Sequence, residues 1–152
     1  MTSLVFRALD HHVVHGAADR LAVDAGPAQL TYAQLLAQTA AFAGGLVQVG
    51  VREGTPVAIL IDGIDEIVAV LACARIGAIP SEEADFRIDG SPAVVHTSEH
   101  DYPWATVLSA GKTDPIPSPE ADPDGYVELL AGSYEDLFAA LLEGETYRTP
   151  QA

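Results

Sequence analysis

Apolar residues recur with two different spacings along the first half of the chain. Residues 56–61 (PVAILI) are apolar without alternation, which is typical of a strand covered on both faces in a parallel sheet. Before this run, apolar residues recur at helical spacing over residues 31–50. After it, residues 65–75 are apolar nearly all round, with acids at the start and a base at the end, which predicts a buried helix. Helix, strand and helix in this order predict an α/β fold in which helices pack on a layered, partly parallel sheet.

The predicted helix over residues 31–50 carries clear signals at both ends. Thr31 and Gln34 form the pattern of a capping box, and Gly50 is expected to end the helix. Gly44 and Gly45 weaken its interior by about 1 kcal/mol each, but their missing side chains favour close packing at that point. Before this helix, residues 1–20 and 21–30 predict a short helix and a hairpin that turns at Gly26-Pro27.

The second half of the chain has a different pattern. Three short apolar runs, residues 93–97, 105–110 and 126–131, predict strands, and the prolines of residues 113–124 predict an extended, exposed connector. Ser133 is expected to cap a last helix, which Gly144 ends. The apolar stripe of this helix consists of Tyr134, Leu137, Phe138, Leu141 and Leu142.

These elements predict four stretches of the chain. Residues 1–112 are expected to form the main α/β region, followed by the acidic connector at 113–124. Residues 125–144 are expected to add a strand and an amphipathic helix to the same domain. Residues 145–152 are expected to be a frayed tail.

Acidic residues are concentrated in the second half. The chain of 152 residues has a formal net charge of −15. Residues 1–80 carry 7 acids and 4 bases, whereas residues 81–152 carry 15 acids and 3 bases. This charge disfavours nucleic acid and anionic membranes as partners and favours a protein with a basic surface, or it only keeps the chain soluble. Arginine outnumbers lysine by 6 to 1, which suggests a GC-rich bacterial genome.

Residues 21–80 contain the segments LTYAQL, VREGTPVAILID and EIVAVLACARIGAIP in this order. Together these segments resemble the N-terminal part of the AMP-forming adenylating enzymes, a superfamily of acyl-CoA synthetases, adenylation domains and luciferase. The segment LTYAQL (Leu30–Leu35) is similar to the family's L-T-Y-x-E-L. The segments VREGTPVAILID (Val51–Asp62) and EIVAVLACARIGAIP (Glu66–Pro80) are similar to the strand and helix that follow it in the family. The resemblance implies the fold of a fragment of the adenylating-enzyme N-terminal domain.

The resemblance also implies which parts an active enzyme needs. A Ser/Thr/Gly-rich loop with a lysine holds the ATP phosphates, and later motifs hold adenine, ribose and the carboxylate. Here DGYVELLA (124–131) stands where the strand before that loop is expected, and GSYEDLFAALLEG (132–144) follows it without threonine or lysine. Glu135 and Asp136 would repel phosphates. We therefore expect a chain truncated before the ATP-binding motifs, a pseudoenzyme that binds no cofactor and does not adenylate on its own.

Other candidate sites are weak. His11 and His15 have the spacing of two helical metal ligands, but no third ligand is evident, and His96 and His100 are expected to diverge at a strand end. We therefore expect no metal site. Cys73 lies in an apolar run and is expected to be a core residue in a reducing, cytoplasmic environment.

Three functions remain open from the sequence. The first is a non-catalytic interaction or regulatory subunit, which forms a homodimer or binds an adenylating or acyl-transfer enzyme. Its possible interface is the stripe of the last helix together with Trp104. The second is the front half of a split acyl- or aminoacyl-adenylating enzyme that a partner completes in trans. The third is a sensor of a small acyl or nucleotide ligand.

Overall fold

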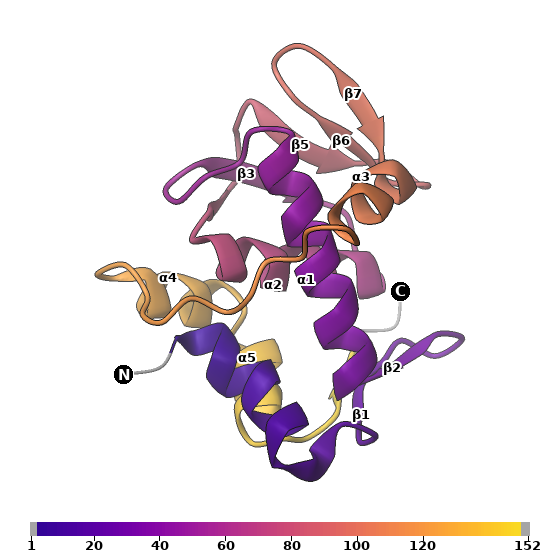
Figure 1. Cartoon of the computed structure of the whole chain (residues 1–152), viewed down its shortest axis with the longest axis vertical. Coiled ribbons are helices and arrows are strands. Elements are labelled where there is room, and N and C mark those ends of the chain that lie inside the picture. Colours follow the sequence, from indigo (N-terminus) through magenta and orange to yellow (C-terminus); the bar gives the residue numbers. More distant parts are fainter. Residues whose placement is uncertain (1–2, 150–152) are drawn as a thin grey trace. The chain divides into compact units, whose positions relative to one another are not determined.

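The apolar run at 56–61 supplies an inner strand of a mixed sheet in the computed structural model, which describes residues 3–149. The chain divides into two compact units, residues 38–117 and the segments before and after them. The five-stranded sheet of residues 38–117 has the order β4-β3-β5-β6-β7, and Figure 1 labels β3, β5, β6 and β7. Its strands are β3 (Pro56–Leu60), β4 (Ile79–Ser81), β5 (Phe86–Asp89), β6 (Val94–His96) and β7 (Asp101–Pro103).

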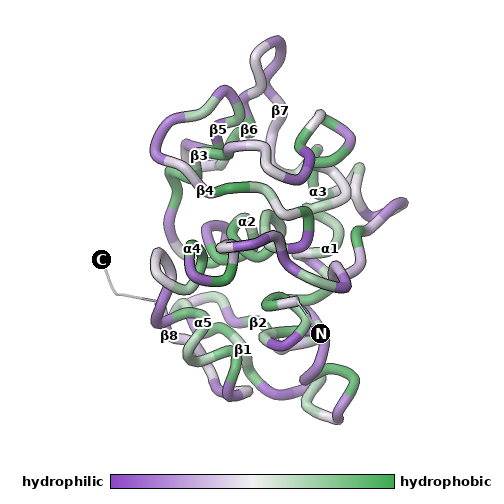
Figure 2. Tube along the Cα trace, turned by 90° about the vertical axis from the view of Figure 1, so that its left-hand side faces the viewer, coloured by the Kyte–Doolittle hydropathy of each residue, from purple (hydrophilic) through white to green (hydrophobic). Residues whose placement is uncertain are grey.

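Helix α2 (Gly63–Ile76) is the apolar centre of this unit. It packs against β3 and β4, and its nine consecutive residues from Ile67 to Arg75 are buried. Figure 2 shows α2 as a mainly hydrophobic segment, as expected for a helix that covers a sheet and is itself covered. Gly77 ends it in the left-handed conformation that glycine adopts without strain. Because β3 is hydrogen-bonded in parallel to both β4 and β5, the predicted partly parallel sheet is confirmed.

Two helices cross at glycines in the same unit. Helix α1 (Tyr32–Gln48) places Gly45 against α3 (Trp104–Gly111), where a Cβ on Gly45 would overlap the carbonyl oxygen of Val107. A Cβ on Gly111 would overlap the carbonyl oxygen of Ala41 in the same way. The predicted close packing at the α1 glycines is therefore confirmed, and the glycines are required by contact rather than by backbone conformation.

The other unit contains a three-stranded sheet of order β2-β1-β8. Strands β1 (Leu21–Asp24) and β2 (Gln29–Thr31) form the predicted antiparallel hairpin, and β8 (Tyr147–Arg148) pairs in parallel with β1. The capping box at the start of α1 is present, since Thr31 N donates to Gln34 Oε1 at 2.9 Å and Gln34 N donates to Thr31 Oγ1 at 3.2 Å. The hairpin and the cap were thus both correctly predicted.

Helical segments from both ends of the chain pack together in this unit. The N-terminal segment contains the π-helical turns η1 (Phe6–Asp10) and η2 (Val13–Ala17). The C-terminal segment contains α4 (Tyr126–Ser133) and α5 (Glu135–Leu142), and α5 contacts η1, α4 and β8. The predicted N-terminal helix is confirmed from residue 4 onward, and its first two positions lie outside the described residues.

Several predictions for the second half were wrong. Residues 105–110 and 126–131 lie in helices α3 and α4 and not in strands. The strand prediction failed because a short apolar run without alternation fits a helix as well as a strand. Pro103 and Gly125 directly precede the two helices and mark where they start. Ser133 is the last residue of α4 and does not cap α5, which has no side-chain cap. The tail is not frayed as far as residue 149, because β8 pairs with β1, and residues 150–152 lie outside the described part.

Candidate functional site

The predicted interface stripe of α5 is divided between the interior and the surface. Leu137, Phe138 and Leu141 are 4%, 1% and 0% exposed, so these three side chains are part of the core. Tyr134 and Leu142 are half-buried. Only the half-buried pair offers surface to a partner, and an interface at this stripe remains a prediction.

Trp104, the sixth predicted interface residue, begins α3 and is half-buried. Its ring stacks on that of Phe42 from α1, with 3.9 Å between centroids and 22° between planes. Its backbone N–H donates to the carbonyl of Ala93 at 3.0 Å. These contacts fix the indole against the unit and leave part of it exposed.

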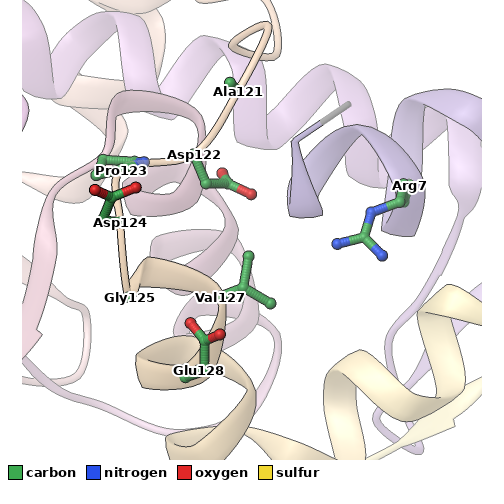
Figure 3. Close-up of a pocket in the computed structure, with 8 residues that line it drawn as sticks. All are labelled: Arg7, Ala121, Asp122, Pro123, Asp124, Gly125, Val127 and Glu128. Atoms are coloured by element: carbon green, nitrogen blue, oxygen red, sulfur yellow. The ribbon is translucent and has the colours of Figure 1, made fainter. Parts of the chain in front are cut away.

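A surface hollow of about 570 Å³ lies between η1 and the segment that leads into α4 (Figure 3). Arg7 forms one wall, and its guanidinium has no recorded ion pair with the described residues. Asp122, Asp124 and Glu128 carry carboxylates on the opposite wall, and Val127 points toward Arg7 between them. The hollow is therefore lined by three negative charges and one positive charge, and two of the negative charges, those of Asp124 and Glu128, are exposed.

One carboxylate of the hollow also has a structural role. The backbone N–H of Leu4 donates to Asp122 Oδ2 at 2.7 Å, so Asp122 caps the first turn of the N-terminal helix from 118 residues away. Asp124 and Glu128 are exposed, and their carboxylates form no hydrogen bond with residues 3–149. Their charges are therefore available for a ligand, whereas that of Asp122 is partly used in the fold.

A second hollow, of about 620 Å³, lies at the carboxyl ends of the parallel strands β3 and β5. Asp62 and Asp65 line it at the start of α2, beside the half-exposed Leu60. Burial raises the pKa of Asp65 above its ordinary value. Ligands of open α/β sheets bind at this end of the strands, but the acids here would repel phosphates.

Histidine 96 forms a bridge that the sequence did not predict. Its Nε2 lies 2.7 Å from Asp89 Oδ1 on β5, and its Nδ1 lies 2.7 Å from Asp101 Oδ1 on β7. Arg87 Nε also donates to Asp89, at 2.7 Å. The hydrogen bonds to Asp101 and Asp89 raise the pKa of His96 above its ordinary value.

The other sequence candidates are placed as follows. His15 Nδ1 lies 2.8 Å from the carbonyl oxygen of His11, so that imidazole is bound to the backbone. In the part of the chain that the structure describes, no group of three or more His, Cys, Asp or Glu is arranged to hold a metal ion. Cys73 is fully buried, and burial raises the pKa of its thiol to about 12, so the thiol stays protonated at neutral pH.

Comparison with known proteins identifies the origin of the first half. The sequence profile of the AMP-binding enzyme family matches residues 9–82. Residues 9–82 therefore belong to the AMP-binding enzyme family and correspond to part of such an enzyme. The three motifs that resemble adenylating enzymes all lie within or at the edge of this family segment, and they form β2 with the start of α1, then β3, then α2 with β4.

Related sequences extend the similarity beyond the family segment. The mitochondrial acyl-CoA synthetase short-chain family member 3 of Rattus norvegicus is 37% identical over 114 residues, which cover 64% of this chain and 17% of that protein. The acetyl-coenzyme A synthetase of Burkholderia thailandensis is 43% identical over 82 residues, which cover 50% of this chain and 12% of that protein. Malformin synthetase of Aspergillus homomorphus is 36% identical over 140 residues, which cover 84% of this chain and 3% of that protein. The chain therefore spans less than a fifth of the length of these curated relatives.

A solved structure confirms the fold over the entire chain. An artificially fused adenylation-PCP di-domain from Klebsiella oxytoca superposes with a TM-score of 0.74 at 16% identity, covering 100% of this chain and 40% of that one. The α/β fold with mixed sheets therefore matches a portion of an adenylation domain. In the described residues of the chain, no helix is both long and apolar enough to cross a membrane.

Proposed function

We propose that this chain is a non-catalytic interaction module that binds a partner protein in the hollow between Arg7 and Glu128. The observation that carries this proposal is the charge pattern of the hollow, in which two exposed carboxylates face solvent beside one guanidinium that has no ion pair within the described part of the chain. A partner segment with two basic side chains and one acidic side chain complements this pattern. The strongly acidic second half of the chain would steer such a partner toward the hollow.

The family segment supports the choice of partner. Residues 9–82 match the AMP-binding enzyme family, and we infer that the rest of such an enzyme has surfaces that fit this fold. We therefore propose that the partner is an adenylating or acyl-transfer enzyme with a basic surface. The module would regulate or position that enzyme without binding ATP itself.

The test compares two variants with the same change in charge. Affinity capture of the tagged chain from its host at low salt, followed by mass spectrometry of intact complexes, identifies the partner. The purified partner is then titrated with the double variant D124N/E128Q and with the control E82Q/E83Q, whose glutamates are exposed and lie outside the hollow. We expect about 10-fold weaker binding for the first variant, little change for the control, and weaker binding at high salt.

Two results would contradict the docking proposal. One is a chain that stays monomeric and captures no partner at fixed stoichiometry. The other is equal binding by the two double variants, which would place the interface elsewhere, for example at the half-buried residues Tyr134 and Leu142 of α5.

A second candidate function is completion of an adenylating enzyme in trans. It is favoured by the fold, because the whole chain superposes on part of an adenylation-PCP protein. It requires ATP–pyrophosphate exchange that occurs only when this chain and its partner are mixed. Exchange at the same rate by the partner alone would rule out this candidate while leaving the docking proposal intact.

A further inference from the structure

Three strands place one histidine between two aspartates on the same face of the sheet. In the register of the antiparallel strands, His96 lies opposite Asp101 on β7 and opposite Arg87 on β5. Because side chains alternate between faces, Asp89 shares that face, whereas Ile88 and Val95 point to the other face and are fully buried. The bridge therefore crosses three strands on their polar side.

The geometry of the bridge requires a charged imidazole. A carboxylate oxygen only accepts hydrogen bonds, so both imidazole nitrogens must carry a proton to donate to Asp89 and Asp101 at once. A neutral imidazole would turn one nitrogen lone pair toward a carboxylate and lose that bond. We propose that Asp89, His96 and Asp101 form a protonation-dependent clamp. It reinforces the backbone pairing of the β6–β7 hairpin with β5 while His96 is charged and loosens when His96 is neutral.

The clamp acts on the start of α3. Strand β7 ends at Pro103 and α3 begins at the next residue, Trp104, so the position of the hairpin sets the position of the indole. Helix α3 contacts both β6 and β7, and Trp104 stacks on Phe42. Loosening of the hairpin would therefore disturb the stacking at the half-exposed indole.

The charged groups around His96 determine the pH range of the clamp. Asp89 and Arg87 face it from β5 and Asp101 from β7, whereas α3, which packs on β6 and β7, has no ionisable side chain. Because the pKa of His96 is raised in the folded chain, the clamp loses strength as the pH rises above about 6.5 and through the higher folded value. Hydrogen bonds from Arg87 and His96 lower the pKa of Asp89. The clamp is therefore also lost in acid, when the pH falls below the ordinary pKa range of aspartate and Asp89 takes up a proton.

Two signals in the same sample test the clamp. Nuclear magnetic resonance follows the titration of the His96 imidazole, while fluorescence follows Trp104, which is the single tryptophan of the chain. Between about pH 5 and pH 9 we expect a His96 midpoint above the ordinary value of about 6.5, and a change in Trp104 fluorescence with the same midpoint. The substitution Asp101→Asn should shift both midpoints downward, and His96→Gln should abolish the fluorescence change.

The matched control is Glu99→Gln, which removes the same charge from the same hairpin but has no recorded hydrogen bond to His96. This variant should leave both midpoints close to those of the parent chain. The proposal is overturned if Asp101→Asn and Glu99→Gln shift the His96 midpoint equally, or if Trp104 fluorescence does not follow the titration of His96. Neither result depends on the partner proposed above.

Discussion

The family segment and the region after it are stabilised in different ways. In the family segment, α2 alone buries nine consecutive residues. After it, α3 and α4 bury two residues each and α5 buries three. Stabilisation by burial grows with the apolar area removed from water, so the first region contributes most of the core. The second region buries fewer residues and needs further contacts to fix its position.

Hydrogen bonds between distant residues supply part of that position. The Tyr32 hydroxyl donates to the carbonyl oxygen of Glu145 at 2.6 Å, and the Thr146 hydroxyl donates to that of Leu21 at 2.7 Å. Such bonds contribute only about 1 kcal/mol each, but their directions specify one arrangement. The comparison therefore predicts large losses of stability from core substitutions in the family segment and smaller losses from the removal of polar contacts.

The largest effect is expected from the core of α2. Leu71 is fully buried there, whereas Leu129 in α4 is 39% exposed. The substitution Leu71→Ala should lower the free energy of unfolding by about 2–5 kcal/mol, because it removes buried methyl groups and leaves a cavity. Leu129→Ala is the control, and it should cost clearly less. Denaturant unfolding measures both, and equal losses would contradict the difference between the two regions.

A smaller effect is expected where α1 crosses α3. The substitution Gly45→Ala places a Cβ on the carbonyl oxygen of Val107 and should lower the free energy of unfolding by about 1–3 kcal/mol, although alanine favours helix. Gly132→Ala in α4 meets no atom of the described residues within 4 Å and should raise stability by about 0.5–1 kcal/mol. Opposite signs in thermal unfolding would confirm the close contact, whereas stabilisation by both substitutions would exclude it.

This comparison also explains how much the sequence could predict. The continuous apolar run of β3, the hairpin turn at Gly26 and the capping box of Thr31 depend on residues close together in the chain. Such local patterns were sufficient for the fold class and for most elements up to residue 80. In the second half, short runs such as residues 126–131 fit a strand as well as a helix, and only tertiary contacts decide between them.

The candidate sites were the least predictable part. Arg7 and Asp122 line one hollow although they lie 115 positions apart in the sequence, and no local pattern indicates that they come together. The bridge at His96 was missed because β7 was not predicted. A hairpin that turns over residues 97–100 would have placed Asp101 opposite His96, so a correct strand assignment was the one signal in the sequence that could have revealed it.

The smallest effect is expected from Tyr32, which tests the polar contacts alone. Burial raises the pKa of Tyr32 to about 12, so the unfolded chain loses this proton first, near pH 10. The stabilising contribution of the neutral hydroxyl is therefore complete below about pH 10 and is lost as the pH rises through about 12. Tyr32→Phe should cost about 0.5–1.5 kcal/mol at neutral pH and should flatten the alkaline loss of stability.

Tyr102→Phe, whose hydroxyl has no recorded hydrogen bond among the described residues, is the control. If both variants lose the same stability and keep the same alkaline slope, the bond between Tyr32 and Glu145 does not help to hold the end of the chain in place.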